Sequence, residues 1–202
     1  MTDHTRLRMH REHVRVSNRE MITGFLEQEC VANVGLHDEP YPYVVPMNYG
    51  YEWDAEGSLV FWFHMAFEGH RLELIEADPH VSVCVWSFLL RNGHHKPYRG
   101  EQHDYRSVMA YGTAEVVYPD RDPEEFLRGF GILCDHTDFA KPRRITDSIA
   151  QRLRVLKVTC PSELVIGKMQ YDYTGPEDIA MPSVEDVDAG RVDPRKVPPY
   201  AG

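Results

Sequence analysis

The sequence lacks the features that would place it in a membrane, in an oxidising compartment or on a nucleic acid. No apolar run approaches the ~18 residues of a transmembrane helix, and residues 1–12 are charged where a signal peptide would be apolar. The four cysteines are widely spaced without a C-x-x-C pair, so neither a zinc knuckle nor a redox dithiol is indicated. Positive charge is scarce: 22 Lys and Arg residues against 32 Asp and Glu residues give a formal net charge of −10. We therefore expect a cytoplasmic protein with reduced, buried cysteines that binds neither nucleic acid nor membrane.

The standard catalytic motifs are missing as well. The sequence contains no nucleophile elbow, Walker loop or H-E-x-x-H zinc motif. Gly129 and Gly131 lack the third glycine of a dinucleotide fingerprint, and they follow a helix signal rather than a strand. Three histidines could supply the ligands of a zinc site: His94, His95 and His103. Their spacing, however, matches no standard set of zinc ligands. A solvated polar loop is the favoured interpretation, and no metal is predicted.

What the 202 residues do contain is a series of short strands with helices between them. Asp122 followed by Pro123 is typical of a helix start, and Ser17 and Glu20 have the spacing of a capping box. Strand and helix do not alternate regularly, so we predict a mostly β fold, a small antiparallel barrel with peripheral helices. The expected strands are 31–36, 41–53, 58–65, 80–87, 105–118, 153–160 and 163–169, and the expected helices cover 17–29, 69–77, a stretch opening at 122, and 145–151.

Composition divides the chain into three parts. Residues 1–16 are basic and form an N-terminal arm, and 17–172 form the barrel domain. The tail, 173–202, is rich in proline and poor in large apolar residues, so it is either disordered or an arm laid over a partner. A polar stretch, 91–104, is a long loop between two strands.

The segment most informative about function joins an aromatic strand to a helix through a glycine turn. The helix is predicted to begin at Gly69, and the first N–H groups of a helix lack internal partners and accept a phosphate readily. His70 and Arg71 stand at this point, and an arginine can chelate two phosphate oxygens. The alternative is a plain connection in which Arg71 pairs with Glu68 or Glu73. The residues alone leave both interpretations open.

Five segments of the chain form a recognisable series: Tyr43–Glu52, Phe61–His64, Gly69–Leu72, Asp78–Val81 and Tyr105–Glu115. Together they resemble the pyridoxamine 5′-phosphate oxidase-like flavin-binding family, and its nitroimidazole reductase branch in particular. The resemblance spans roughly half the chain and lies in the order and spacing of the segments rather than in one motif.

The resemblance implies a split β-barrel homodimer that holds FMN at its subunit interfaces. In that family one strand runs along the flavin ring and offers it backbone groups, and the next strand lies near the ribityl chain. Residues matching His70 and Arg71 bind the phosphate, and the position matching Ser107 approaches the flavin. The cofactor-binding positions implied here are Val45, Pro46, Met47, Asn48, Phe63, His64, Met65, His70, Arg71 and Ser107.

The expected function is that of an FMN-dependent oxidoreductase, which takes electrons from a nicotinamide and reduces a small organic acceptor such as a nitro-aromatic or a quinone. Pyridoxamine phosphate oxidation itself is not expected, because that enzyme has a basic residue where Asn48 stands and glutamine where Ser107 stands. Two alternatives remain: a non-catalytic FMN- or haem-binding protein, and a reductase that uses a deazaflavin.

Overall fold

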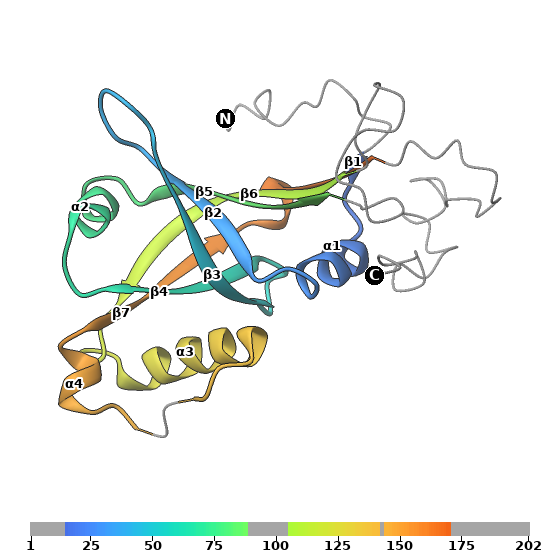
Figure 1. Cartoon of the computed structure of the whole chain (residues 1–202). Helices are drawn as coiled ribbons and strands as arrows, with labels where there is room; N and C mark the ends of the chain where they lie inside the picture. The colour runs from blue at the N-terminus through green and yellow to red at the C-terminus, as the bar shows by residue number, and fades with distance from the viewer. Residues whose placement is uncertain (1–14, 89–104, 142–143, 171–202) are drawn as a thin grey trace. The chain divides into compact units, whose positions relative to one another are not determined.

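The computed structural model describes residues 15–88, 105–141 and 144–170 (Figure 1). These residues separate into two compact units, each described here by itself. The larger unit comprises Cys30–Cys84 and Met109–Val165, and the smaller unit takes the described parts of 1–29, 85–108 and 166–202. The predicted tail and the loop with His94, His95 and His103 lie outside the described residues.

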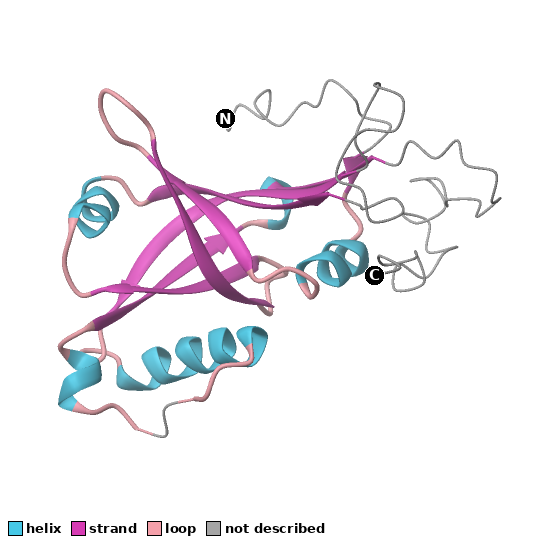
Figure 2. Ribbon diagram, in the orientation of Figure 1, coloured by secondary structure: helices cyan, strands magenta, loops and turns pink. Residues whose placement is uncertain are grey.

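The larger unit contains a closed antiparallel barrel, which confirms the prediction of a mostly β fold (Figure 2). The order around the barrel is β6-β5-β2-β3-β4-β7, and a further pairing of β6 with β7 closes it. The strands are β2 (Val31–Leu36), β3 (Tyr43–Trp53), β4 (Leu59–Ala66), β5 (His80–Phe88), β6 (Tyr105–Val117) and β7 (Leu153–Cys160).

The long strand β3 changes partner halfway along its length. Its first half, Tyr43–Asn48, pairs with β2, and its second half, Tyr49–Trp53, pairs with β4. Among the described strands, none forms a ladder with the other edge of Tyr43–Asn48. Backbone groups on that edge are therefore available to something other than the sheet.

Strand β4 is covered on both faces, as its aromatic residues predict. The side chains of Phe61 and Phe63 alternate with that of Trp62, and all three are fully buried. The Phe61 ring lies 5.6 Å from the ring of Tyr49 on β3, so these two side chains share the inner face. Trp62 points the other way, toward helix α3.

Helix α3 (Pro123–Thr137) begins as its sequence predicts, because the Asp122 side chain accepts a hydrogen bond from the Glu125 N–H at 3.1 Å. Two glycines let this helix approach the barrel closely. A Cβ on Gly50 of β3 would lie 2.6 Å from the Leu133 backbone nitrogen, and a Cβ on Gly129 would overlap the Trp62 ring. The resulting buried cluster contains Val60, Trp62, Val117, Phe126 and Val155, with Phe130, Ile132, Ile145, Ile149 and Leu153 packed against it.

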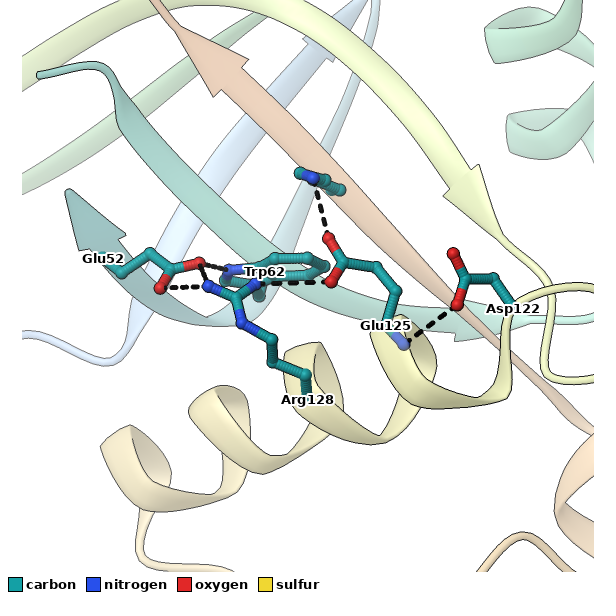
Figure 3. A network of polar contacts seen from close by, with 6 residues as sticks. Glu52, Trp62, Asp122, Glu125 and Arg128 are labelled. Atoms are coloured by element: carbon teal, nitrogen blue, oxygen red, sulfur yellow. Dashed lines mark hydrogen bonds and ion pairs between the residues drawn. The ribbon is translucent and has the colours of Figure 1, made fainter. Parts of the chain in front are cut away.

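A network of charged side chains fastens α3 to the barrel above this cluster (Figure 3). Arg128 donates to both carboxylate oxygens of Glu52 at 2.6 Å, and the Trp62 indole N–H donates to Glu52 Oε1 at 2.9 Å. Lys157 on β7 donates to Glu125 Oε1 at 2.7 Å, and both Arg128 and Lys157 lie over the Trp62 ring. The indole is thus held at its edge and covered by cations as well as being buried.

Glu52→Gln should lower the free energy of unfolding by about 0.5–1 kcal/mol at low salt. The amide oxygen can still accept from Trp62, so the loss reports mainly the ion pair with Arg128, which is partly exposed. The measurement is urea unfolding at low and high salt, with Glu56→Gln in the exposed β3–β4 turn as the control. A loss that does not shrink with added salt would contradict an electrostatic contribution.

The smaller unit combines two short strands and a helix. Strand β1 (Arg15–Val16), at the end of the predicted arm, pairs with β8 (Val165–Gln170). Helix α1 (Arg19–Leu26) buries its apolar face, and its cap is Asn18, whose Oδ1 accepts from the Met21 N–H at 3.1 Å. The prediction of Ser17 as the cap is therefore wrong by one residue.

The remaining elements are short. They are α2 (His70–Ala77), α4 (Asp147–Ala150) and the 3-10 turn η4 (Ser162–Leu164). No helix in the described ranges is long and apolar enough to cross a membrane. The prediction that all four cysteines are buried is wrong for Cys30, which is exposed at the start of β2, and Cys84 is only half-buried. Burial raises the pKa of the Cys160 thiol to about 12, so that thiol stays protonated.

Candidate functional site

The first turn of α2 is built around a glycine. Gly69 is the residue before the helix and has φ +123°, a conformation that other residues rarely adopt. No side chain of the described ranges caps this helix end, so its first N–H groups lack the usual side-chain partner there. The turn thus offers the unsatisfied donors that an anion can accept.

Arg71, the second residue of α2, reaches back to the barrel rather than to an acid. Its Nη1 lies 3.0 Å from the sulfur of Met47 on β3, and its Nε is buried without a hydrogen-bond partner. No carboxylate in the described residues forms an ion pair with it, so the alternative pairing with Glu68 or Glu73 is not formed there. A partly buried guanidinium with an unused donor is strongly suited to receive an anion.

Arg71 contacts Met47, which lies on the half of β3 whose second edge forms no ladder with another described strand. Val45 is half-buried and Pro46 is exposed on this half-strand. Asn48 is fixed, because its side-chain amide donates to the Cys30 carbonyl at 3.1 Å. The geometry therefore places a cation against a side chain of the half-strand whose second edge forms no ladder with another described strand. These two features suit a planar group with an anionic end.

His64 lies on β4 and points to the side of the strand that faces α3. Its ring meets Phe130 edge-on, with centroids 6.3 Å apart. The pKa of His64 is lowered, first because protein atoms displace water from around the ring and second because of the positive charge on Arg71. A neutral imidazole at pH 7 can both donate and accept a hydrogen bond.

His70 is engaged with acids. Its Nε2 lies 2.8 Å from Asp38 Oδ2, and its Nδ1 lies 3.6 Å from Glu73 Oε2. The pKa of His70 is raised, chiefly by the hydrogen bond to Asp38, so the ring gains positive charge near neutral pH. Both ring nitrogens nonetheless lie near carboxylates, although more than half of the side chain is exposed.

The positions expected to bind the cofactor fall into three groups. Met47 and Arg71 are in contact, and Met47 lies on the same half of β3 as Val45, Pro46 and Asn48. Phe63 and Met65 are buried in the barrel, so their side chains are core residues. Ser107 is half-buried on β6 in the smaller unit and is not placed relative to the others.

Sequence reasoning missed Asp38. This residue lies in the turn between β2 and β3, and its carboxylate contacts a histidine 32 positions later in the chain. The turn His37-Asp38-Glu39-Pro40 has the composition of any polar turn, so no local signal distinguishes Asp38.

A closed antiparallel barrel with a cationic turn after its aromatic strand is the architecture of a split-barrel protein. The chain belongs to the pyridoxamine 5′-phosphate oxidase-like family: a family profile described as pyridoxamine 5′-phosphate oxidase matches residues 18–159. No curated protein matches the chain significantly.

Solved structures share the fold. A proposed 5-nitroimidazole antibiotic resistance protein from Bacteroides thetaiotaomicron is 25% identical with a TM-score of 0.61, and the match covers 77% of this chain and 86% of that one. A FAD- and haem-binding protein from Mycobacterium smegmatis is 19% identical with a TM-score of 0.62, covering 88% and 80%. The flavocytochrome Anf3 from Azotobacter vinelandii is 20% identical with a TM-score of 0.62, covering 89% and 81%.

Proposed function

We propose that this protein binds FMN and uses it to reduce a small organic acceptor. The observation that carries the proposal is Arg71, whose buried Nε has no partner among the described residues and whose guanidinium contacts the Met47 side chain on the first half of β3. Family membership supports a flavin as the group in question. Arg71 fits the phosphate of FMN, and the backbone of the first half of β3 fits its ring.

The chain's own residues have distinct tasks in this proposal. Arg71 and the first N–H groups of α2 bind the phosphate, since both offer donors with positive charge. Backbone groups between Val45 and Asn48 hold and orient the ring and stabilise negative charge that develops on it. His64, neutral at pH 7, donates or accepts a hydrogen bond near Arg71.

The bound flavin supplies hydride and electron transfer between donor and acceptor. A reduced nicotinamide and a nitro-aromatic fit the expected chemistry: NADH, a proton and R–NO2 give NAD⁺, R–NO and water. The nitro acceptor is the first choice because of the resemblance to the nitroimidazole reductase branch and the similarity to the Bacteroides protein. The protein's part is to hold the flavin in place and to orient its ring.

We further propose a homodimer. Two apolar side chains of the larger unit, Val31 at 47% and Val44 at 62% exposure, lie on the paired strands β2 and β3. A second copy of the chain would cover such residues and the flavin ring together. Light scattering with and without FMN tests this, and a monomer at every concentration would contradict it.

The direct experiment is to purify the protein, titrate it with FMN, FAD, riboflavin and haemin, and record the absorption and fluorescence of each. Binding of FMN near one equivalent per chain, tighter than riboflavin, supports the proposal. A haem Soret band without flavin binding would favour a haem protein, and binding of neither would exclude both.

Turnover then separates an enzyme from a carrier. The FMN-loaded protein is mixed with NADH or NADPH and a nitro-aromatic, and the loss of reduced nicotinamide is followed. The control is the same mixture with free FMN at equal concentration. A rate no faster than free FMN would leave a flavin-binding protein without this activity.

A further inference from the structure

The β2–β3 turn and the first turn of α2 are joined by one pair of side chains. Asp38 Oδ2 and His70 Nε2 lie 2.8 Å apart, and the His70 ring meets the Tyr43 ring edge-on at 5.8 Å. Asp38 lies in the turn and Tyr43 is the first residue of β3 after it, whereas His70 opens the helix. The contact therefore links two segments that no ladder between the described strands connects.

His70 and Arg71 are neighbours in the sequence but do different things. Both nitrogens of His70 face carboxylates, those of Asp38 and Glu73. The Arg71 guanidinium rests on the Met47 sulfur with its Nε unused. One residue of the pair is thus fixed to the protein, and the other is free for a ligand.

We propose that Asp38 is a positioning residue, which through His70 holds the first turn of α2 so that Arg71 stays beside the free edge of β3 and can bind a phosphate monoester. This inference rests on the proposed flavin function. It gives His70 a task that differs from direct phosphate binding, and it gives Asp38 a task where the sequence suggested none.

The contact depends on pH in a defined direction. The charged groups that face His70 are Asp38 from the turn and Glu73 from α2, with the Tyr43 ring on β3 beside them. The pKa of His70 is raised from about 6.5. The stabilisation that protonated His70 gains from its contact with Asp38 is therefore complete below that value and is lost as the pH rises through the raised pKa. The pKa of Asp38 is lowered from about 3.8, so the carboxylate is charged throughout this range. The contact should hold at mildly acidic pH and weaken in mildly alkaline solution.

The test compares wild-type protein with the Asp38→Asn variant. For each, the affinity for FMN is divided by the affinity for riboflavin at several pH values between 6 and 9. Riboflavin lacks the phosphate, so the ratio reports the phosphate end alone, and comparison at equal pH cancels the ionisation of the phosphate itself. We expect the ratio to fall about threefold to tenfold at neutral pH, less than for loss of a direct charge-assisted bond. Wild-type and variant ratios should converge at the alkaline end.

The matched control is Asp78→Asn. Asp78 Oδ1 contacts His80 Nδ1 at 2.7 Å, an exposed Asp–His pair at the other end of α2. This substitution should leave the flavin ratio unchanged. Circular dichroism and the melting temperature of each variant confirm that it is folded at the temperature of the titration.

A readout independent of flavin is the NMR titration of the histidine rings. Asp38→Asn should lower the pKa of His70, and Asp78→Asn should leave the pKa of His70 in place. An unchanged His70 titration in Asp38→Asn would show that the contact is absent. A lowered His70 pKa with an unchanged flavin ratio would overturn the positioning role. If wild-type protein binds neither flavin, the proposed function fails first and the positioning role fails with it, whatever the histidines show.

Discussion

Replacing Arg71 by alanine should weaken FMN binding about 10- to 100-fold and leave riboflavin binding nearly unchanged. The substitution removes a guanidinium that contacts the Met47 side chain and whose buried Nε has no hydrogen-bond partner among the described residues. A charge-assisted contact to phosphate contributes about 1–3 kcal/mol, which sets the expected range. Fluorescence titration with both ligands measures it.

Arg144→Ala is the control for net charge, because Arg144 is exposed between α3 and α4. It removes one positive charge from the same unit without touching α2. Equal losses for FMN and riboflavin in Arg71→Ala would point to a damaged fold instead of a lost phosphate contact. Unchanged FMN affinity would remove Arg71 from the site.

The lengths of the strands and the start of α3 could be predicted because their signals are local. Asp122 and Pro123 mark a helix start through the chemistry of capping, and the structure has the helix begin there. Val81, Val83 and Val85 alternate with Ser82, Cys84 and Trp86, and the three valines are buried on β5. Where two neighbours cap equally well the sequence cannot choose, so Asn18 takes the place predicted for Ser17.

The contacts that position the candidate site could not be predicted, because they join distant parts of the chain. The Asp38–His70 pair spans 32 positions and the Glu52–Arg128 pair spans 76. Each depends on strand register and on where a helix rests, which local composition does not encode. A family resemblance predicts which residue types stand at aligned positions but not where their side chains point. For this reason it did not predict that His70 faces Asp38 and Glu73.

Gly129→Ala should destabilise the protein by about 1–3 kcal/mol, although alanine is the better helix former. A Cβ at this position would overlap Cε3 and Cζ3 of Trp62 and lie 2.9 Å from Cδ2. The indole cannot move aside easily, because it is fully buried and its N–H is bonded to Glu52. Gly131, two residues further along α3, is the matched control, because a Cβ there meets nothing within 4 Å.

Gly131→Ala should therefore stabilise the protein by about 0.5–1 kcal/mol, the opposite sign, from helix propensity alone. Urea unfolding of the two variants gives the comparison, and Trp62→Phe supplies the test of mechanism. If overlap with the indole is the cause, Gly129→Ala should cost less in the Trp62→Phe background than in wild type, so the two losses will not add. Equal stabilisation by both glycine substitutions would mean that α3 does not rest on Trp62, and the close approach of this helix to the barrel would be wrong.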